Sequence, residues 1–387
     1  MARLNIYDPR ERAMVATADA LLRPLALRRA WRPRLEAAPG RILCFRVERI
    51  GDLLMTLPAL AELRALAPAA TIDLAVGDWN RAIAGAIRGI DRVETLSPAW
   101  LARDGSEGLS SLALMRKAAD WRDRHYDLAI NFEPDIRTNI ALAMTGARRT
   151  AGFASGGGGA LLDLALDFEA SAHTADNALA LVRATMGARC EETPPSSLDI
   201  PDERRQQASR LLEPLGRRPR VGIHVSGGRE IKQWPESRFR DVAEHLVRNR
   251  DAGIVLTGAP TDRAQVEIVR SVLAPERVVD LTGTDLLTTA AVIAQLDLFV
   301  TGDTGPMHLA RAVETPIVAI FGPSDPRRYG PRGVRDTVVR VDLPCSPCNR
   351  IRLPPARCTG HTPACLAEID SPLVIAEIDD ALARSAR

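Results

Sequence analysis

The chain has 387 residues, enough for two domains of ordinary size, and 46% of them are hydrophobic and 26% charged. Its 51 basic and 49 acidic residues leave a net charge of +2, which argues against a nucleic-acid-binding protein. No apolar run approaches the roughly 20 residues of a membrane span, and the first residues lack the apolar core of a signal peptide. The composition therefore predicts a globular, cytoplasmic protein.

An arginine-rich segment, residues 20–35, lies within an N-terminal extension of residues 1–40. It holds five arginines and no acid, interleaved with leucines: Arg23, Arg28, Arg29, Arg32 and Arg34. Pro24 and Pro33 limit any helix between them to about two turns. The segment could lie as a peripheral contact on the anionic inner membrane, or pack on the first domain with a solvated arginine face. Both interpretations stay open.

Alternating strand and helix patterns form two blocks, which predict two α/β domains. In residues 41–195 the expected strands are Ile42–Val47, Ile72–Val76, Val93–Leu96, Leu128–Phe132 and Thr150–Phe153. After a Pro- and Ser-rich linker, residues 203–370 have expected strands at Val221–Val225, Ile254–Leu256, Val278–Leu281, Leu298–Val300 and Ile317–Phe321. Helix-length segments between strands imply parallel sheets, which bind ligands beyond the carboxyl ends of their strands.

The expected helices alternate with these strands: Leu53–Leu66, Ser110–Arg124, Pro235–Arg248, Thr261–Leu273, Thr288–Ala294, Pro306–Val313 and Leu373–Ala383. A run of glycines at residues 155–159 predicts a flexible loop. This loop either closes over a substrate or is a neutral surface insertion.

The segment Phe299–Pro323 carries the most specific functional pattern. A buried strand ends in a turn of small residues, Gly302–Gly305, which leads directly into a helix. Backbone N–H groups at a helix start have no intrahelical partner, and the helix dipole favours an anion there. His308 lies in the first turn, where it adds a donor. The pattern predicts a phosphate-binding turn or, more plainly, a tight strand-to-helix turn with a polar cap.

This segment resembles the donor-binding motif of glycosyltransferase family 9, the bacterial ADP-heptose–lipopolysaccharide heptosyltransferases. Further motifs match in the expected order: Arg41–Pro58, Val221–Phe239, Ile254–Pro260 and Phe321–Pro326. The resemblance implies two facing doubly wound Rossmann-like domains of the GT-B type. It also implies that residues 371–387 form a C-terminal helix that returns to the first domain.

The resemblance implies an inverting transfer of a sugar, heptose from ADP-heptose, to a hydroxyl of a lipopolysaccharide core or related glycan. Its partners would be the nucleotide-diphosphate sugar and a glycan or glycolipid acceptor, and catalysis would need no cofactor. Two alternatives remain. One is a related nucleotide-sugar transferase that modifies a protein or another glycan, and the other is a non-catalytic nucleotide-binding relative.

Asp52 follows Gly51 just after the first expected strand. The resemblance puts the general base here, because a sugar hydroxyl is a poor nucleophile unless a positioned carboxylate takes its proton. The alternative is structural, since Asp is favoured as the N-cap of a helix that begins at Leu53. Just upstream, Glu48 and Arg49 stand where small hydroxyl residues are common in the family, which leaves open how the acceptor is oriented.

Lys232 lies in the loop after the strand Val221–Val225. The 51 basic residues include only two lysines, Lys117 and Lys232, so a lysine in this loop is informative. A fixed cation stabilises the charge that develops on a departing nucleoside diphosphate. Lys232 is the first choice for this role and Arg229 the second, while a solvated surface lysine is the plainer interpretation.

The expected donor site combines loops at several strand ends. Backbone N–H groups of Thr304 and Gly305 would meet phosphate oxygens, Asp303 could bind sugar hydroxyls, and His308 could support either. Small residues at another strand end would admit a flat base, beside an acid that holds a ribose hydroxyl or caps the next helix: Gly258, Ala259 and Asp262. The remaining members of the expected donor-binding set are Gly51, Ser226, Gly227, Arg229 and Lys232.

Four cysteines crowd into residues 345–365: Cys345, Cys348, Cys358 and Cys365. A Cys-x-x-Cys pair followed by two further thiols suits a structural zinc or iron site, in which His361 could replace one thiol. The resemblance adds that such loops recur in the family and hold iron in some protein-modifying relatives. Free thiols and disulfides are the alternatives. Three arginines make the loop basic, which suits an anionic acceptor or a partner subunit: Arg350, Arg352 and Arg357.

Overall fold

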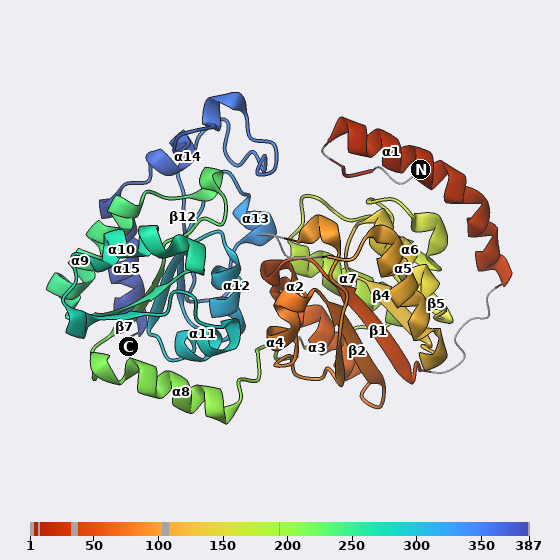
Figure 1. Cartoon of the computed structure of the whole chain (residues 1–387), viewed down its shortest axis with the longest axis horizontal. Helices are drawn as coiled ribbons and strands as arrows, with labels where there is room; N and C mark the ends of the chain where they lie inside the picture. Colours follow the sequence, from red (N-terminus) through yellow and green to blue (C-terminus); the bar gives the residue numbers. More distant parts are fainter. Residues whose placement is uncertain (1–3, 7, 32–37, 103–107, 193, 386–387) are drawn as a thin grey trace. The chain divides into compact units, whose positions relative to one another are not determined.

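The computed structural model describes residues 4–6, 8–31, 38–102, 108–192 and 194–385 (Figure 1). The chain divides into two compact units, Met1–Ser196 and Ser197–Arg387. Each unit has one six-stranded sheet with helices on both faces, and all the strand pairs are parallel. The prediction of two doubly wound α/β domains is therefore confirmed.

The first unit has the strand order β3-β2-β1-β4-β5-β6. Its strands are β1 (Arg41–Arg46), β2 (Thr71–Val76), β3 (Arg92–Thr95), β4 (Leu128–Asn131), β5 (Arg149–Phe153) and β6 (Leu164–Leu166). Its helices are α1 (Pro9–Leu22), α2 (Ile50–Met55), α3 (Leu57–Leu66), α4 (Arg81–Ala84), α5 (Ser111–Ala119), α6 (Ile136–Met144) and α7 (Thr174–Met186).

The second unit has the order β12-β11-β10-β7-β8-β9. Its strands are β7 (Arg220–His224), β8 (Gly253–Thr257), β9 (Val278–Asp280), β10 (Leu298–Gly302), β11 (Ile317–Ile320) and β12 (Thr337–Val339). Its helices are α8 (Asp202–Leu212), α9 (Glu236–Arg250), α10 (Arg263–Arg270), α11 (Leu286–Ile293), α12 (Gly305–Ala312), α13 (Pro326–Tyr329), α14 (Ala364–Ala367) and α15 (Ser371–Ser385).

Both sheets follow the same winding scheme. In each unit the first and fourth strands are neighbours: β1 pairs with β4, and β7 pairs with β10. The chain reverses its direction of winding at these pairs, and ligands of open parallel sheets bind beside the carboxyl ends at such a point. The loops that follow these four strands are therefore the places to search for a site.

The central strands are apolar because helices cover both of their faces. All five residues of β10 are buried, and β1 is buried from Ile42 onward. The expected helix Leu53–Leu66 is instead two helices that meet at Thr56, with Pro58 in the first turn of α3, where its missing N–H costs nothing.

The C-terminal helix α15 belongs to the second unit, which corrects the expectation that it returns to the first domain. It packs against α9 and against β10, β11 and β12. Val374, Ile378 and Ala381 are buried on one face and complete the core of that unit. Trp234 Nε1 donates to the carbonyl oxygen of Ile369, just before the helix, at 2.9 Å. Burial of this apolar face holds α15 in the second unit.

Helix α1 packs on the glycine-rich loop of residues 155–159. All residues of this loop are buried, and Ala154 and Ala160, which flank it, are half-buried. Asp19 Oδ1 accepts the Gly158 N–H at 2.7 Å. Gly157 has a φ of +88°, and a Cβ there would lie 2.5 Å from Val15 Cγ1, so only glycine fits. The surface-insertion interpretation is therefore wrong. Of the arginine-rich segment, Arg32 and Arg34 lie outside the described residues, as do the side chains of Arg28 and Arg29.

No helix in the described part of the chain is long and apolar enough to cross a membrane.

A buried ion pair joins α3 to α7 in the first unit. Arg183 donates from Nε and Nη2 to the two carboxylate oxygens of Glu62, both at 2.8 Å. The Glu62 side chain is 0% exposed, whereas Arg183 is 38% exposed. The hydrogen bonds from Arg183 hold the pKa of Glu62 below its ordinary value, and they outweigh the opposing effect of burial. The Cys190 N–H adds a further bond to Glu62 at 3.1 Å.

The two partners of this pair should differ in how much their loss destabilises the fold. Arg183→Met leaves a buried carboxylate without its cation and should cost about 3–5 kcal/mol, whereas Glu62→Gln leaves an arginine that water can reach and should cost about 1–2 kcal/mol. Because the folded pKa of Glu62 is lowered, its contribution is present above the unfolded pKa and is lost as pH falls through the folded one. Urea unfolding from pH 7 to about pH 2 should show the difference in unfolding free energy between wild type and Glu62→Gln narrowing below the unfolded pKa of Glu. Equal losses for Arg183→Met and Glu62→Gln at pH 7 would contradict this account.

Candidate active site

In the second unit, the loops after β7 and β10 bring Lys232 and Asp303 together. Lys232 Nζ lies 2.9 Å from Asp303 Oδ2, although 71 positions separate the two residues in the sequence. Their side chains are only 18% and 12% exposed. Lys232 is thus a partly buried, fixed cation, and the solvated-surface interpretation of this lysine is wrong.

The loop before Lys232 is tightly folded. Gln233 Oε1 accepts the Gly227 N–H at 2.6 Å, and a Cβ on Gly227 would lie 2.6 Å from the backbone nitrogen of Gln233. Ser226 Oγ accepts the Gly228 N–H at 3.1 Å. Arg229, the second candidate for the cation, is exposed. Gly227 is therefore needed for the close approach that presents Lys232 at the strand end.

Asp303 lies just before α12, whose N-cap is Thr304. Burial works to raise the pKa of Asp303, but the charge of Lys232, hydrogen bonds from Ser324 and Lys232, and the charge of His308 together hold it below the ordinary value. His308 is 8% exposed in the first turns of α12, and Gly305 begins that helix. The structure thus gathers a carboxylate, two basic groups and a helix N-terminus at one strand end. Ser324 was not singled out, although it falls within the Phe321–Pro326 motif.

The expected base-binding residues follow β8. Asp262 Oδ2 accepts the Ala259 N–H at 2.8 Å, a bond back into the loop, and its side chain makes no capping bond to the following helix α10. Its expected role toward a ribose stays a prediction. A Cβ on Gly258 would lie 3.2 Å from Val266 Cγ2, which ties this glycine to packing of α10. His224 was missed by the sequence analysis. Burial lowers its pKa to about 4, and its Nδ1 lies 3.0 Å from Thr257 Oγ1, so a neutral imidazole stands beside this loop.

In the first unit, Asp52 is not a helix cap. Helix α2 begins at Ile50, and its N-cap is Arg49, which makes no side-chain capping bond. Asp52 and Gly51 lie in the first turn, and the Asp52 side chain is 31% exposed. Its Oδ1 lies 3.6 Å from Arg46 Nη2. The N-cap alternative is therefore wrong, and a partly exposed carboxylate stands at the switch point of the first sheet.

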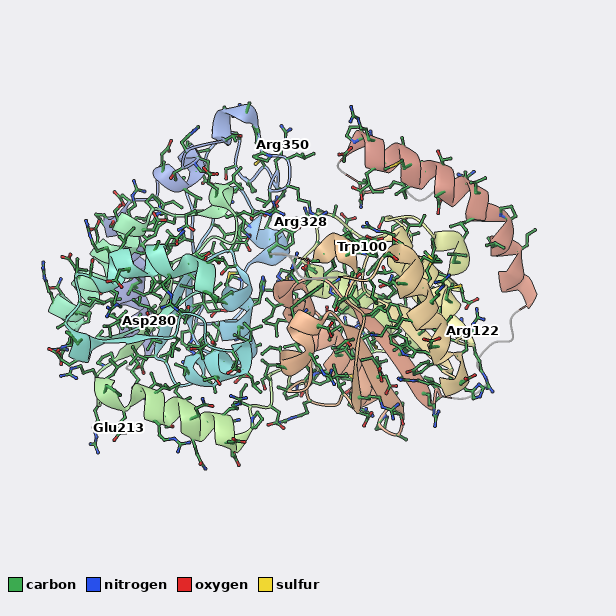
Figure 2. All side chains as sticks on the ribbon, in the orientation of Figure 1. Trp100, Arg122, Glu213, Asp280, Arg328 and Arg350 are labelled. Carbon is green, nitrogen blue, oxygen red and sulfur yellow. The ribbon has the colours of Figure 1, made fainter. Side chains whose placement is uncertain are left out.

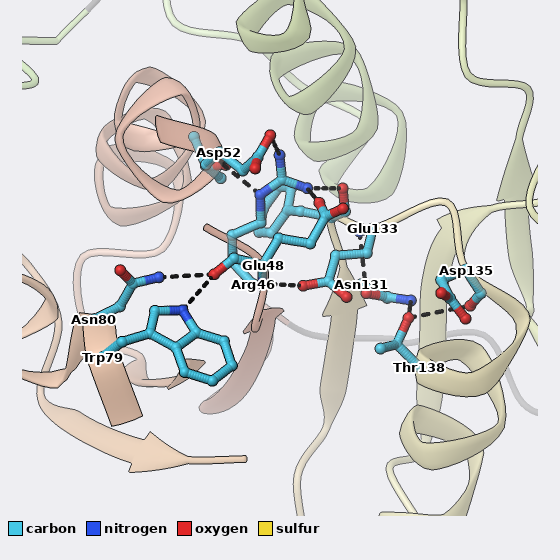
Figure 3. Close-up of polar contacts among 11 residues, drawn as sticks. Arg46, Glu48, Asp52, Trp79, Asn80, Asn131, Glu133, Asp135 and Thr138 are labelled. Carbon is cyan, nitrogen blue, oxygen red and sulfur yellow. Dashed lines mark hydrogen bonds and ion pairs between the residues drawn. The ribbon is translucent and has the colours of Figure 1, made fainter. Parts of the chain in front are cut away.

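Arg46, the last residue of β1, organises the surroundings of Asp52 (Figure 3). Its side chain is 3% exposed, and Nη1 lies 3.0 Å from Glu48 Oε2. Nη1 also donates to the Phe132 carbonyl at 2.7 Å, and Nε donates to the Asp52 carbonyl at 3.1 Å. Sequence analysis missed Arg46. The signal was a charged residue that interrupts an apolar strand, which demands a buried partner.

Glu133 is a second residue that the sequence analysis missed. It follows β4, is 2% exposed, and its Oε1 accepts the Glu48 N–H at 2.9 Å. Burial and then the charge of Glu48 raise its pKa well above the ordinary value, against the lowering effect of Arg46. Asn131 Oδ1 accepts the Glu133 N–H at 3.1 Å and fixes the loop. Three carboxyl groups thus surround one buried arginine.

The four cysteines of residues 345–365 are free thiols in the structure, which therefore does not contain the disulfides of that alternative. Burial first, and then the negative charges of Cys348, Cys345 and Cys358, raise the pKa of Cys365 to about 11. The other three cysteines of the loop are thus close enough to Cys365 to act on it electrostatically. Within the described residues, no three His, Cys, Asp or Glu side chains converge closely enough to hold a metal ion. Arg350 lies on this loop (Figure 2).

Comparisons with known proteins identify the family of this chain. The sequence model of glycosyltransferase family 9 (heptosyltransferase) matches residues 115–354, more than half of the chain. Lipooligosaccharide heptosyltransferase 2 of Haemophilus influenzae is 34% identical over 135 residues, which are 33% of this chain and 38% of that protein. The chain thus spans well under half the length of that relative. Lipopolysaccharide heptosyltransferase 2 of Escherichia coli is 24% identical over 317 residues, 78% of this chain and 88% of that protein.

The fold has a solved counterpart. The structure of Escherichia coli ADP-heptose lipopolysaccharide heptosyltransferase II superposes with a TM-score of 0.73 at 20% identity, covering 90% of this chain and all of the other. At this identity the superposition shows the fold alone, whereas the family model covers the strand-end motifs from Val221 to Pro326 that form the Lys232–Asp303 site. The chain belongs to glycosyltransferase family 9, the heptosyltransferases.

Proposed function

We propose that this protein is an inverting glycosyltransferase that moves heptose from ADP-heptose to a hydroxyl of a lipopolysaccharide core glycan. The observation that carries the proposal is the Lys232–Asp303 ion pair, held in front of the N-terminus of α12 in a chain of family 9. The names of the relatives support the sugar and the acceptor, since those proteins are heptosyltransferases of lipopolysaccharide or lipooligosaccharide. The name of the solved counterpart supports ADP-heptose as donor.

The proposed chemistry is a single displacement. The acceptor oxygen forms a bond to the anomeric carbon, the bond from that carbon to the phosphate oxygen breaks, and its electron pair leaves with the nucleoside diphosphate. Lys232 stabilises the negative charge of the leaving group, together with the N–H groups at the start of α12. Asp52 takes the proton of the acceptor hydroxyl as it attacks. No cofactor is required for these steps.

Substitutions should separate the roles of Asp52 and Lys232. Asp52→Asn should leave donor affinity nearly intact, because Asp52 acts on the acceptor, and should slow single turnover about 10²–10⁴-fold. Lys232→Ala should weaken donor binding and slow turnover together, because its charge serves both the bound and the departing diphosphate. Calorimetry of ADP-heptose binding beside single-turnover rates measures both effects.

The only other lysine supplies the control. Lys117 lies in α5 of the first unit, and Lys117→Ala should change neither donor affinity nor turnover. An Asp52→Asn variant that keeps most of its turnover would remove Asp52 from the mechanism. A Lys232→Ala variant with wild-type donor affinity would leave the donor site unsupported.

We also propose that the four cysteines of residues 345–365 bind one structural zinc or iron ion. Thiolates are soft ligands that select these metals, and Cys345, Cys348 and Cys358 already lie close enough to act electrostatically on Cys365. A bound cation would offset the cost of deprotonating Cys365, whose raised pKa favours the neutral thiol, and would draw the sulfurs together. The ion would brace the loop and take no part in sugar transfer.

Elemental analysis of purified protein should therefore find about one equivalent of zinc or iron. Cys348→Ser should lower that content and the melting temperature, because the binding energy of a structural metal becomes folding energy. Cys190→Ser, which removes a thiol outside the loop, is the matched control and should keep the metal. Metal-free wild-type protein whose melting is unchanged by added zinc or iron would refute the site.

A third proposal places the protein at the cytoplasmic face of the inner membrane, held there by α1 and the 3₁₀ segment Arg23–Trp31. Val15 and Asp19 turn toward the buried glycine-rich loop, whereas Met14 and Leu21, two helix turns apart, share another face. Met14, Leu21 and Leu27 are 66%, 78% and 74% exposed. Exposed apolar side chains beside basic residues favour the surface of an anionic bilayer.

Removing this apolar face should release the protein from vesicles. Each leucine that enters a bilayer contributes about 1.5–3 kcal/mol, so the double variant Leu21→Ser, Leu27→Ser should bind phosphatidylglycerol vesicles at least tenfold more weakly in co-sedimentation. Leu112→Ser, at a leucine of α5 that is 58% exposed, should bind as wild type does. Equal binding of the wild type to neutral phosphatidylcholine vesicles, or binding to neither, would reject the membrane surface.

A further inference from the structure

Glu48, two residues after the end of β1, contacts Arg46, the arginine beside Asp52. We infer that Glu48 is a positioning residue for Asp52: it engages Arg46 and so limits Asp52 to a long ion pair, which keeps that carboxylate able to accept a proton. The inference rests on the proposed function, because it takes Asp52 as the general base.

The guanidinium of Arg46 cannot move freely toward the carboxylate of Glu48 or of Asp52. Two backbone carbonyls hold it, that of Phe132 at 2.7 Å from Nη1 and that of Asp52 at 3.1 Å from Nε. The side chain is 3% exposed, so water cannot replace these contacts. Arg46 is therefore a fixed charge whose remaining N–H groups are divided between acidic neighbours.

Two carboxylates compete for that charge, and Glu48 has the closer position. Glu48 Oε2 lies 3.0 Å from Nη1, within hydrogen-bond distance, whereas Asp52 Oδ1 lies 3.6 Å from Nη2, beyond it. A short charge-assisted bond stabilises the ionised carboxylate and makes it a poorer base. Glu48 therefore has the stronger bond to Arg46, and Asp52 has only the longer ion pair.

The backbone of Glu48 is fixed on both sides, which is why it keeps this position (Figure 3). Its carbonyl accepts from Trp79 Nε1 and from Asn80 Nδ2, both at 2.9 Å. Its N–H donates to Glu133 Oε1 at 2.9 Å. Asn80 is fully buried, so this support is part of the core of the first unit.

Glu133 does not take Arg46 away from Glu48. Burial first, and then the charge of Glu48, raise the pKa of Glu133 and favour its protonated form. Other charged or titratable groups lie on the surrounding elements: Arg49 at the start of α2, Glu62 on α3, Asp78 after β2, Asp135 after β4, Arg137 on α6, and His173 and Asp176 at the start of α7. Glu62 is bonded to Arg183, and Asp135 to Arg137.

Replacement of Glu48 by its neutral isostere tests the inference. Glu48→Gln should let Arg46 bond more strongly to Asp52. The single-turnover rate at pH 7.5 should then fall about tenfold, and the acid side of the rate–pH profile should move down by about one pH unit. Affinity for ADP-heptose should not change. Glu48→Asp, which restores the charge, should recover part of both effects. The side chain of Glu48 is 29% exposed, so the amide need not disturb folding.

A matched ion pair in the same unit provides the control. Glu94→Gln breaks the 2.6 Å bond from Arg124 Nη1 and should leave the rate–pH profile in place. A Glu48→Gln variant whose profile stays at the wild-type pH overturns the inference, even if its rate falls, because a purely structural loss would not move the profile. If Asp52→Asn retains turnover, the proposed base itself has failed; if it is inactive while the Glu48→Gln profile is unmoved, only the role of Glu48 has failed.

Discussion

In both units the first and fourth strands lie side by side, and their parallel alignment brings loops that are far apart in the sequence to the same edge of a sheet. This constraint brings the candidate residues together within each unit. It joins Lys232 to Asp303 across 71 positions, and Arg46 to the Phe132 carbonyl across 86. Neither contact joins residues that are near each other in the sequence. Both depend on the buried apolar strands that keep β1 beside β4 and β7 beside β10.

Each edge carries buried charge, which is costly unless it is paired. Lys232 and Asp303 offset the desolvation cost by pairing at 2.9 Å, and Ser324 and His308 further stabilise the Asp303 carboxylate. Arg46 is stabilised by two carboxylates and two backbone carbonyls. Glu133 differs, because its raised pKa favours the neutral acid, which costs less to bury. The first two arrangements keep charged groups at the strand ends, and the third replaces a charge with a neutral acid.

The sequence was most informative where a motif and a strand end coincide. Lys232, Asp303 and His308 were predicted as donor-binding residues, and the structure gathers them at one strand end, although their binding role stays a prediction. The resemblance singled out Asp52 as the general base, and that role stays a prediction. The N-cap alternative was wrong because α2 begins three residues earlier than the apolar pattern indicates. Glycine-rich residues 155–159 were misread because nothing local reveals that α1 covers them.

The residues that the sequence analysis missed share a physical cause. Arg46, Glu133 and His224 matter through partners on neighbouring strands, and a single sequence does not say which strands are neighbours. The edge strands β6 and β12 were missed because three residues are too few to show a period. The place of α15 was predicted from the resemblance alone, and burial of Val374 and Ile378 in the second core decided it.

The two ion pairs at the strand ends differ in a way that suits opposite chemical demands. A group that stabilises a departing diphosphate must be held in place, and a contact of 2.9 Å with Asp303 fixes the position of Lys232. A group that accepts a proton must not be bonded too strongly to a cation, and Asp52 Oδ1 lies 3.6 Å from Arg46 Nη2. The closer contact goes to Glu48, which the mechanism does not otherwise use. One arginine can therefore hold the loop of the proposed base in place while a second carboxylate takes the closer contact.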